Sequence, residues 1–92
     1  MDSFGEYLRE QRDNKGLPLR KVAAELDIDT SILSKIERNE REATKEMLPI
    51  FSKVLERDLK EVEVKYILHS IMTQFSEFKH LKDGLNEALK SL

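Results

Sequence analysis

Residues 16–39 read GLPLRKVAAELDIDTSILSKIERN and contain two short helical patterns in succession. The first opens at Pro18, whose fixed backbone angle suits the start of a helix. Its apolar residues recur at the spacing of a buried helix face: Leu19, Val22, Ala23 and Leu26. The break Asp27-Ile28-Asp29 follows, in which Asp27 tolerates a left-handed backbone and Asp29 is expected to cap the next helix. These features predict two short helices joined by a tight turn.

The second pattern predicts a helix from about Asp29 to Arg38 with one buried and one exposed side. Leu33 and Ile36 are expected to face the core. The opposite side is polar and consists of Thr30, Ser31, Ser34, Lys35 and Arg38. Asn39 follows the helix, where Asn is the usual substitute for Gly. Two helices in this order form the arrangement in which one lies in a DNA groove while the other braces it.

Helical spacing continues on both sides of this unit. A first helix is expected to end at Gly16, and Asp58 with Glu61 resembles a capping box that opens a long fifth helix. The inward apolar side chains of the first and fourth helices are expected to be Phe4, Tyr7, Leu8, Leu48, Phe51, Val54 and Leu55. The sequence therefore predicts an all-α fold in one compact domain, with a core over residues 1–58 and a C-terminal helix and tail over residues 59–92.

Length and charge restrict the classes of function. The chain has 92 residues and no Cys, with 16 basic residues, 18 acidic residues and a formal net charge of −2. A chain of this size closes a modest core but not a deep substrate cleft, and without Cys it forms neither disulfides nor thiolate metal sites. The acidic excess means that any surface for DNA must be local. Six basic residues are available for such a surface: Arg20, Lys21, Lys35, Arg38, Arg41 and Lys45.

Candidate catalytic and metal-binding residues are sparse. His69 and His80 lie eleven residues apart, about three helical turns, which is too far for joint ligation. Ser31 and Ser34 lack the neighbouring base that would suggest a nucleophile, and the chain has no glycine-rich phosphate loop. We therefore expect no enzymatic activity, no metal and no cofactor. The start of the chain lacks a secretory signal and no apolar stretch approaches the roughly 20 residues of a membrane span, so a cytoplasmic, nucleoid-associated protein is expected.

Residues 16–39 resemble the phage-repressor and Cro-like helix-turn-helix family. The resemblance rests on Leu17, Val22-Ala23 and Leu26, and above all on the run SILSKIERN at residues 31–39. It extends over roughly residues 4–62. It implies a lambda-repressor-like five-helix fold, double-stranded DNA as the ligand, a homodimer, and a bacterial or phage origin.

Position by position, the resemblance implies two kinds of DNA contact. Three residues fall where the family reads base edges: Thr30, Ser31 and Lys35. Three more fall where it contacts phosphate: Ser34, Arg38 and Arg41. Arg20 and Lys21, at the start of the preceding helix, are suited to contact the DNA backbone without reading sequence.

Other positions bear on how the predicted recognition helix is supported. Leu19 stands where the family commonly has a phosphate-binding Gln, which leaves Arg20 as the substitute, and Asp27 stands where the family has a turn Gly. The resemblance also implies that Glu37 pairs with Arg12 of the first helix in a partly buried, structural ion pair.

The fifth-helix pattern carries more apolar residues than a short core can cover from one side. Leu68, Ile71, Phe75 and Phe78 recur at alternating three- and four-residue steps, which is typical of a helical dimer seam. We expect these four residues to form a homodimer interface. The alternative is that the seam folds back on the first and fourth helices within one monomer.

These observations predict a dimeric, sequence-specific DNA-binding transcriptional regulator. Three roles remain open within this class: a phage-type repressor, an antitoxin-like autorepressor, and a controller protein of a restriction-modification operon. The alternative function is a helical protein-interaction module that has the same fold and does not bind DNA.

Overall fold

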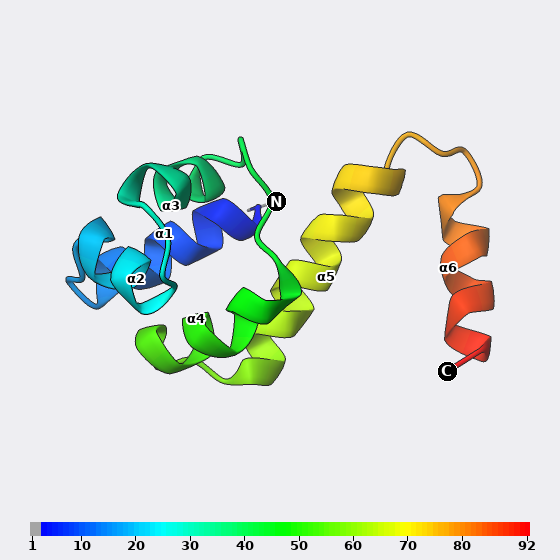
Figure 1. The fold of residues 1–92 in the computed structure, drawn as a ribbon. Coiled ribbons are helices and arrows are strands. Elements are labelled where there is room, and N and C mark those ends of the chain that lie inside the picture. The colour runs from blue at the N-terminus through cyan, green and yellow to red at the C-terminus, as the bar shows by residue number, and fades with distance from the viewer. Residues whose placement is uncertain (1–2) are drawn as a thin grey trace.

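The computed structural model describes residues 3–92, in which every regular element is helical (Figure 1). The elements are α1 (Phe4–Asn14), α2 (Leu19–Glu25), α3 (Thr30–Glu37), the short 3-10 helix η1 (Lys45–Met47), α4 (Leu48–Leu55), α5 (Leu59–Phe75) and α6 (Leu81–Lys90). The predicted all-α fold is confirmed. Residues 1 and 2 of the expected core lie outside the described residues.

The core lies among α1 to α4 and the first turn of α5. It consists of Phe4, Tyr7, Leu8, Val22, Ala23, Leu26, Leu33, Ile36, Ala43, Leu48, Phe51, Leu55 and Val62. Leu33 and Ile36 are 0% and 2% exposed, as the pattern of the second helix of the pair predicts. The boundary expected at residue 58 crosses this core, because Val62 of α5 is also fully buried. The first turn of α5 is therefore part of the unit that positions α3.

Four helices end on a residue with a left-handed backbone: Gly16, Asp27, Asn39 and Glu56. At each of these ends, the amides of the left-handed residue and of the next residue bond back to carbonyls of the last turn, as in the bond from Ile28 N–H to the Ala23 oxygen at 3.1 Å. The residue types at positions 16, 27 and 39 predict this conformation. Glu56 is of a type that rarely adopts it, and its carboxylate forms an ion pair with Lys15.

The expected capping bonds of α3 and α5 are absent from the described residues. Asp29 and Asp58 precede these helices, but neither side chain accepts a hydrogen bond from the helix. Glu61 does not reach back to Asp58, because its carboxylate accepts hydrogen bonds from Arg57 and Tyr7. The predicted capping box is therefore wrong.

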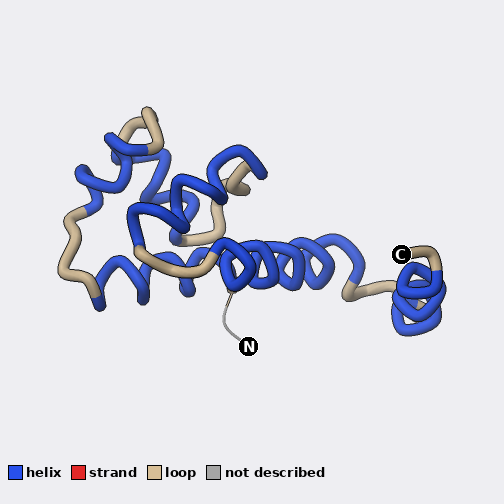
Figure 2. Tube along the Cα trace, turned by 90° about the horizontal axis from the view of Figure 1, so that it is seen from below, coloured by secondary structure: helices blue, strands red, loops and turns tan. Residues whose placement is uncertain are grey.

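α5 leaves the bundle, and α6 stands apart from the other helices (Figures 1 and 2). The expectation of a seam running through Phe78 on one long helix is wrong, since α5 ends at Phe75 and a turn at residues 76–80 leads into a sixth helix. The turn contains neither Pro nor Gly. Instead, it brings the Phe78 ring against Phe75, with 6.0 Å between ring centroids, so an apolar contact forms where the helix stops.

Candidate DNA-binding surface

α2 and α3 pack against each other as a helix-turn-helix pair at one end of the bundle (Figure 1). Residues 26–29 connect them, and the left-handed Asp27 reverses the chain within this connection. Val22 and Ala23 of α2 are each 1% exposed, which places α2 tightly against the core. α3 is thus the second helix of the pair and is supported from behind.

One side of α3 faces solvent. The three predicted base contacts, Thr30, Ser31 and Lys35, are all exposed, and Ser34 is half-buried. Leu33 and Ile36 occupy the opposite side, inside the core. The outer side therefore presents two hydroxyls, a methyl group and an ammonium group, which are groups that can meet base edges in a major groove about 12 Å wide.

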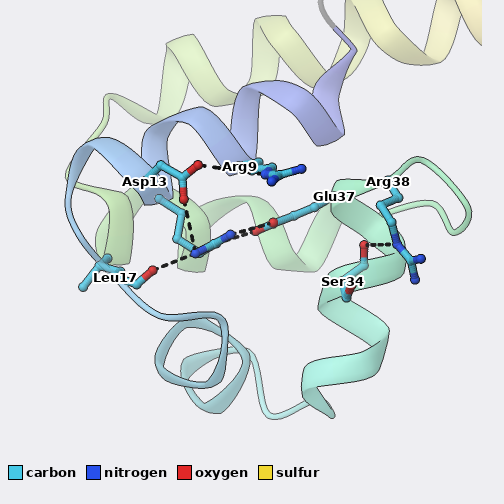
Figure 3. Close-up of polar contacts among 7 residues, drawn as sticks. Arg9, Asp13, Leu17, Ser34, Glu37 and Arg38 are labelled. Carbon is cyan, nitrogen blue, oxygen red and sulfur yellow. Dashed lines mark hydrogen bonds and ion pairs between the residues drawn. The ribbon is translucent and has the colours of Figure 1, made fainter.

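The predicted phosphate contacts lie on α2, on α3 and in the loop after α3. Arg20 and Lys21 begin α2, Arg41 lies in the loop, and all three are exposed. No ion pair involves any of them among residues 3–92. Arg38 differs, because its Nη1 lies 3.4 Å from Oε2 of Glu40. Arg38 Nε also donates to the Ser34 carbonyl at 3.3 Å (Figure 3), so a phosphate at Arg38 competes with contacts that the guanidinium already makes.

Arg12 of α1 and Glu37 of α3 form a bidentate ion pair on the inner side of α3 (Figure 3). Arg12 Nε and Nη2 lie 2.7 Å and 3.0 Å from the two Glu37 oxygens, and the side chains are 12% and 6% exposed. Arg12 Nη1 also donates to the Leu17 carbonyl at 2.8 Å. The hydrogen bond to Glu37 raises the pKa of Arg12 above its ordinary value. One guanidinium thus joins α1, α3 and the segment before α2.

A second link between α1 and α3 was not apparent from the sequence. The Gly5 amide donates to Oδ1 of Asn39 at 3.2 Å, and Nδ2 of Asn39 donates to Oγ of Ser3 at 2.6 Å. A Cβ atom at Gly5 would lie 2.5 Å and 2.6 Å from the carbonyl oxygens of Ile36 and Glu37. Gly5 therefore permits α1 to approach the last turn of α3, although in the sequence it resembles any glycine in a helix.

A third cluster, also missed by sequence reasoning, joins α1 to α5. The Tyr7 hydroxyl donates to Glu61, which also accepts hydrogen bonds from Arg57 at 2.8 Å and 2.6 Å. The bonds from Arg57 and then Tyr7 lower the pKa of Glu61 to about 2. Burial and the bond to Glu61 raise the pKa of Tyr7 above its ordinary value. This cluster is structural, since its groups bond to one another.

The two histidines lie in different surroundings. His69 is half-buried against α1, whereas His80 is exposed in the turn before α6. Across residues 3–92, no group of three or more His, Cys, Asp and Glu side chains is placed to hold a metal ion. Within the same range, no helix is both long and apolar enough to cross a membrane.

An exposed polar helix braced by a second helix, with cationic side chains around it, defines a helix-turn-helix DNA-binding domain. Comparison with protein families agrees: a family described as helix-turn-helix matches residues 8–62, more than half of the chain. The chain belongs to this family of phage-repressor and Cro-like DNA-binding transcription regulators. The match ends at Val62, where the buried core also ends. Comparisons with curated proteins and with solved structures give no match.

Proposed function

We propose that this protein is a sequence-specific repressor or operon controller that binds a two-fold DNA site as a homodimer, with α3 in the major groove. The observation that carries the proposal is the exposed polar side of α3, held from behind by the Arg12–Glu37 pair. Base readout requires a rigid helix whose outer side chains are free to meet the DNA. On this proposal the protein acts in the cytoplasm, on the DNA of a bacterium or phage.

Each exposed side chain of the surface has a proposed contact. Lys35 donates to the O6 and N7 acceptors of guanine, the Thr30 methyl group meets a thymine methyl group, and Ser31 bonds to a base edge. The proposed phosphate contacts are Arg20, Lys21, Ser34, Arg38 and Arg41. Asp27 and Asp29 lie beside the start of α3 and repel phosphate, which favours binding at selected sites over binding to DNA in general.

The proposed dimer interface is the seam of Leu68, Ile71, Phe75 and Phe78. Leu68, Phe75 and Phe78 are 40%, 44% and 58% exposed, and Ile71 is half-buried. α5 packs on the core through Val62, so the exposed seam residues are not those that fold back within the monomer. Large apolar side chains that are exposed next to one another on a protein surface mark an interaction surface.

An apolar groove of about 710 Å³ extends this seam toward the end of the chain. It is lined mainly by Phe75, Phe78, Leu81, Leu85 and Ala88. The groove lies between the end of α5 and α6, whose own apolar residues are exposed except for Leu81. A second copy of the chain offers the same helical segment, so a two-fold arrangement would cover both grooves at once.

Selection of bound fragments from a random DNA pool tests the proposal. The 92-residue chain should enrich two inverted half-sites whose centres are about 10 base pairs apart, or a multiple of that spacing. Enrichment of a single half-site would retain DNA binding and overturn the dimer. A pool without enrichment would overturn the DNA-binding role and favour the protein-interaction module.

A further inference from the structure

The first turn of α1 is held by side chains from three parts of the fold. Amides at the start of a helix have no carbonyl partner within the helix. Here the amides of residues 4, 5 and 6 each donate to a side chain. The acceptors are, in order, Nδ1 of His69 at 3.3 Å, Oδ1 of Asn39 at 3.2 Å and Oγ of Ser3 at 3.1 Å. α5 and the end of the recognition helix therefore meet at one helical turn.

Both ring nitrogens of His69 are engaged. Nδ1 accepts a hydrogen bond from the Phe4 amide, and Nε2 lies 3.3 Å from Oε2 of Glu42. A ring nitrogen that accepts a hydrogen bond carries no proton, so the bond from Phe4 requires the neutral imidazole, with its proton on Nε2. The His69 side chain is 11% exposed, so water does not readily replace the Phe4 amide at Nδ1.

These contacts connect His69 to the DNA-facing part of the molecule. Phe4 precedes Gly5, whose amide bonds to Asn39, two residues after the end of α3. Glu42 lies in the loop after α3, next to the proposed phosphate contact Arg41. His69 thus holds the segments on which the end of α3 and the Arg41 loop depend, although it does not itself lie on the recognition face.

We propose that His69 is a positioning residue for DNA binding, which aligns the end of α3 and the loop after it only while its ring is unprotonated. The inference rests on the DNA-binding function proposed above. Protonation puts an N–H on Nδ1 opposite the Phe4 N–H, and it places a cation beside the positive end of α1. Glu42 does not restore the lost contact, because its carboxylate lies beside Nε2 and not Nδ1, and it is 59% exposed, where water screens its charge.

Few charged or titratable groups surround the ring. The loop after α3 contributes Glu42, and α1 contributes the amide and the aromatic ring of Phe4, whose centroid lies 6.4 Å from that of His69. One turn earlier on α5 are Lys65, whose ammonium lies 5.7 Å from the Tyr7 ring centroid, and Tyr66, whose hydroxyl donates to a backbone carbonyl. Among the described contacts of the ring, Glu42 is the ionised partner.

We expect acid to weaken DNA binding, which is the opposite of what the added positive charge alone would do. Acidification adds positive charge to both histidines, which by itself strengthens attraction to the phosphates. Loss of the Phe4 contact weakens binding instead. We therefore expect the Kd for the selected operator to rise about tenfold as pH falls from about 8 to about 5.5.

The test compares this Kd for the wild type, His69→Asn and His80→Asn by fluorescence anisotropy at constant salt. Asn retains an acceptor at the δ position and does not titrate, so His69→Asn should bind at neutral pH and lose the acid-induced rise. His80→Asn is the matched control, because His80 is exposed before α6, and it should retain the rise. A wild-type Kd that is flat or falls in acid, or a rise that persists in His69→Asn, would overturn the proposal.

Nitrogen-15 NMR of the free protein tests the positioning role of His69 without DNA. It needs only the wild type, so it also serves if His69→Asn does not fold. The Phe4 and Gly5 amide signals and the Asn39 side-chain signals should shift with the same midpoint as the His69 ring. Signals that do not follow the ring would refute the positioning role even if the operator is bound. If these signals follow the ring but the protein binds no DNA at any pH, the DNA-binding function is refuted. The role of His69 in DNA binding is then refuted as well.

Discussion

Glu37 is the buried charged side chain among the described residues, and its partner Arg12 comes from another helix. A carboxylate buried alone costs several kcal/mol, whereas a bidentate guanidinium offsets that cost and sets the direction of both side chains. The pair therefore determines where α3 lies relative to α1, and its effect on net stability is secondary.

Glu37→Ala and Arg12→Ala should each lower the free energy of unfolding by about 3 kcal/mol, because each leaves an uncompensated buried charge. The double variant should cost less than the sum of the two. Urea denaturation followed by circular dichroism measures these losses. Arg9→Ala is the control, since Arg9 and its partner Asp13 are 66% and 59% exposed, and it should change stability by less than about 0.5 kcal/mol. Strictly additive losses would contradict the pairing.

Gly5→Ala tests the close approach of α1 to α3. The added methyl group would meet two backbone carbonyl oxygens at 2.5 Å and 2.6 Å, so we expect a loss of about 1–3 kcal/mol in the same urea experiment. Gly84→Ala is the matched control, because nothing lies within 4 Å of the added atom in α6, and Ala favours a helix by about 1 kcal/mol over Gly. Equal effects of the two substitutions would argue against a tight crossing.

Residue types predicted the outer side of α3 but not most of the contacts behind it. The polar and apolar residues at positions 30–38 alternate with helical periodicity, which can be read along the chain. The bonds of Gly5 and His69 depend on which helices cross and how closely, and no local pattern encodes that. The capping bond of Asp29 was predicted from residue type alone and is not formed.

Helix ends were predictable where a residue type favours the left-handed conformation. Gly16, Asp27 and Asn39 are such residues, and all three adopt it. Glu56 also adopts it but gives no such signal. The end of α5 at Phe75 was missed for a similar reason, because no Pro or Gly marks it and an aromatic contact forms there instead.

α5 has apolar residues on two sides, one of which packs on the core while the other is exposed. Val62 and Tyr66 are four residues apart and pack on the core, whereas Val64 and Leu68 have the same spacing and are 54% and 40% exposed. One side of the helix therefore belongs to the DNA-binding core. The other side is available to a partner.

The contact of α5 with α1 should depend on pH through Glu61. Because its folded-state pKa is lowered to about 2, the stabilisation is present above the ordinary carboxyl pKa of about 4.3 and is lost as pH falls toward 2. Glu61→Gln should therefore lose less stability than the wild type between about pH 5 and pH 2, measured by urea denaturation. Glu63→Gln, an exposed control on the same helix, should behave like the wild type. Identical pH profiles for the wild type and Glu61→Gln would refute this role.

The whole molecule measures 41 × 24 × 21 Å and has two differently packed parts. The core through Val62 is closed and ends at the same residue as the family match. Its pattern was predictable because its helices bury their apolar sides within the chain. The last third is open, since the exposed large apolar residues after Val62 include Ile67, Phe78 and Leu89. Its arrangement was not predictable, because these side chains stay largely exposed and no pattern of burial fixes where α6 lies.

Light scattering should report twice the 10.8 kDa chain mass at micromolar concentration. Leu68→Glu combined with Phe75→Glu should give the single-chain mass and bind the operator far more weakly, since charge in the seam opposes association. Both residues are exposed, so the fold should persist. Leu59→Glu is the control, because Leu59 is 41% exposed but outside the seam. A wild type that stays monomeric both free and on DNA would overturn the dimer.

The most direct test of α3 as the recognition helix is the affinity of Lys35→Ala for the selected operator and its single-base variants at fixed salt. We expect a loss of about 1–3 kcal/mol on the operator and relaxed preference at one position in each half-site. Lys60→Ala removes the same charge at the start of α5, on the other side of the bundle from α3 in Figure 1, and should change neither quantity. Unchanged affinity and preference in Lys35→Ala would contradict the placement of α3 in the major groove.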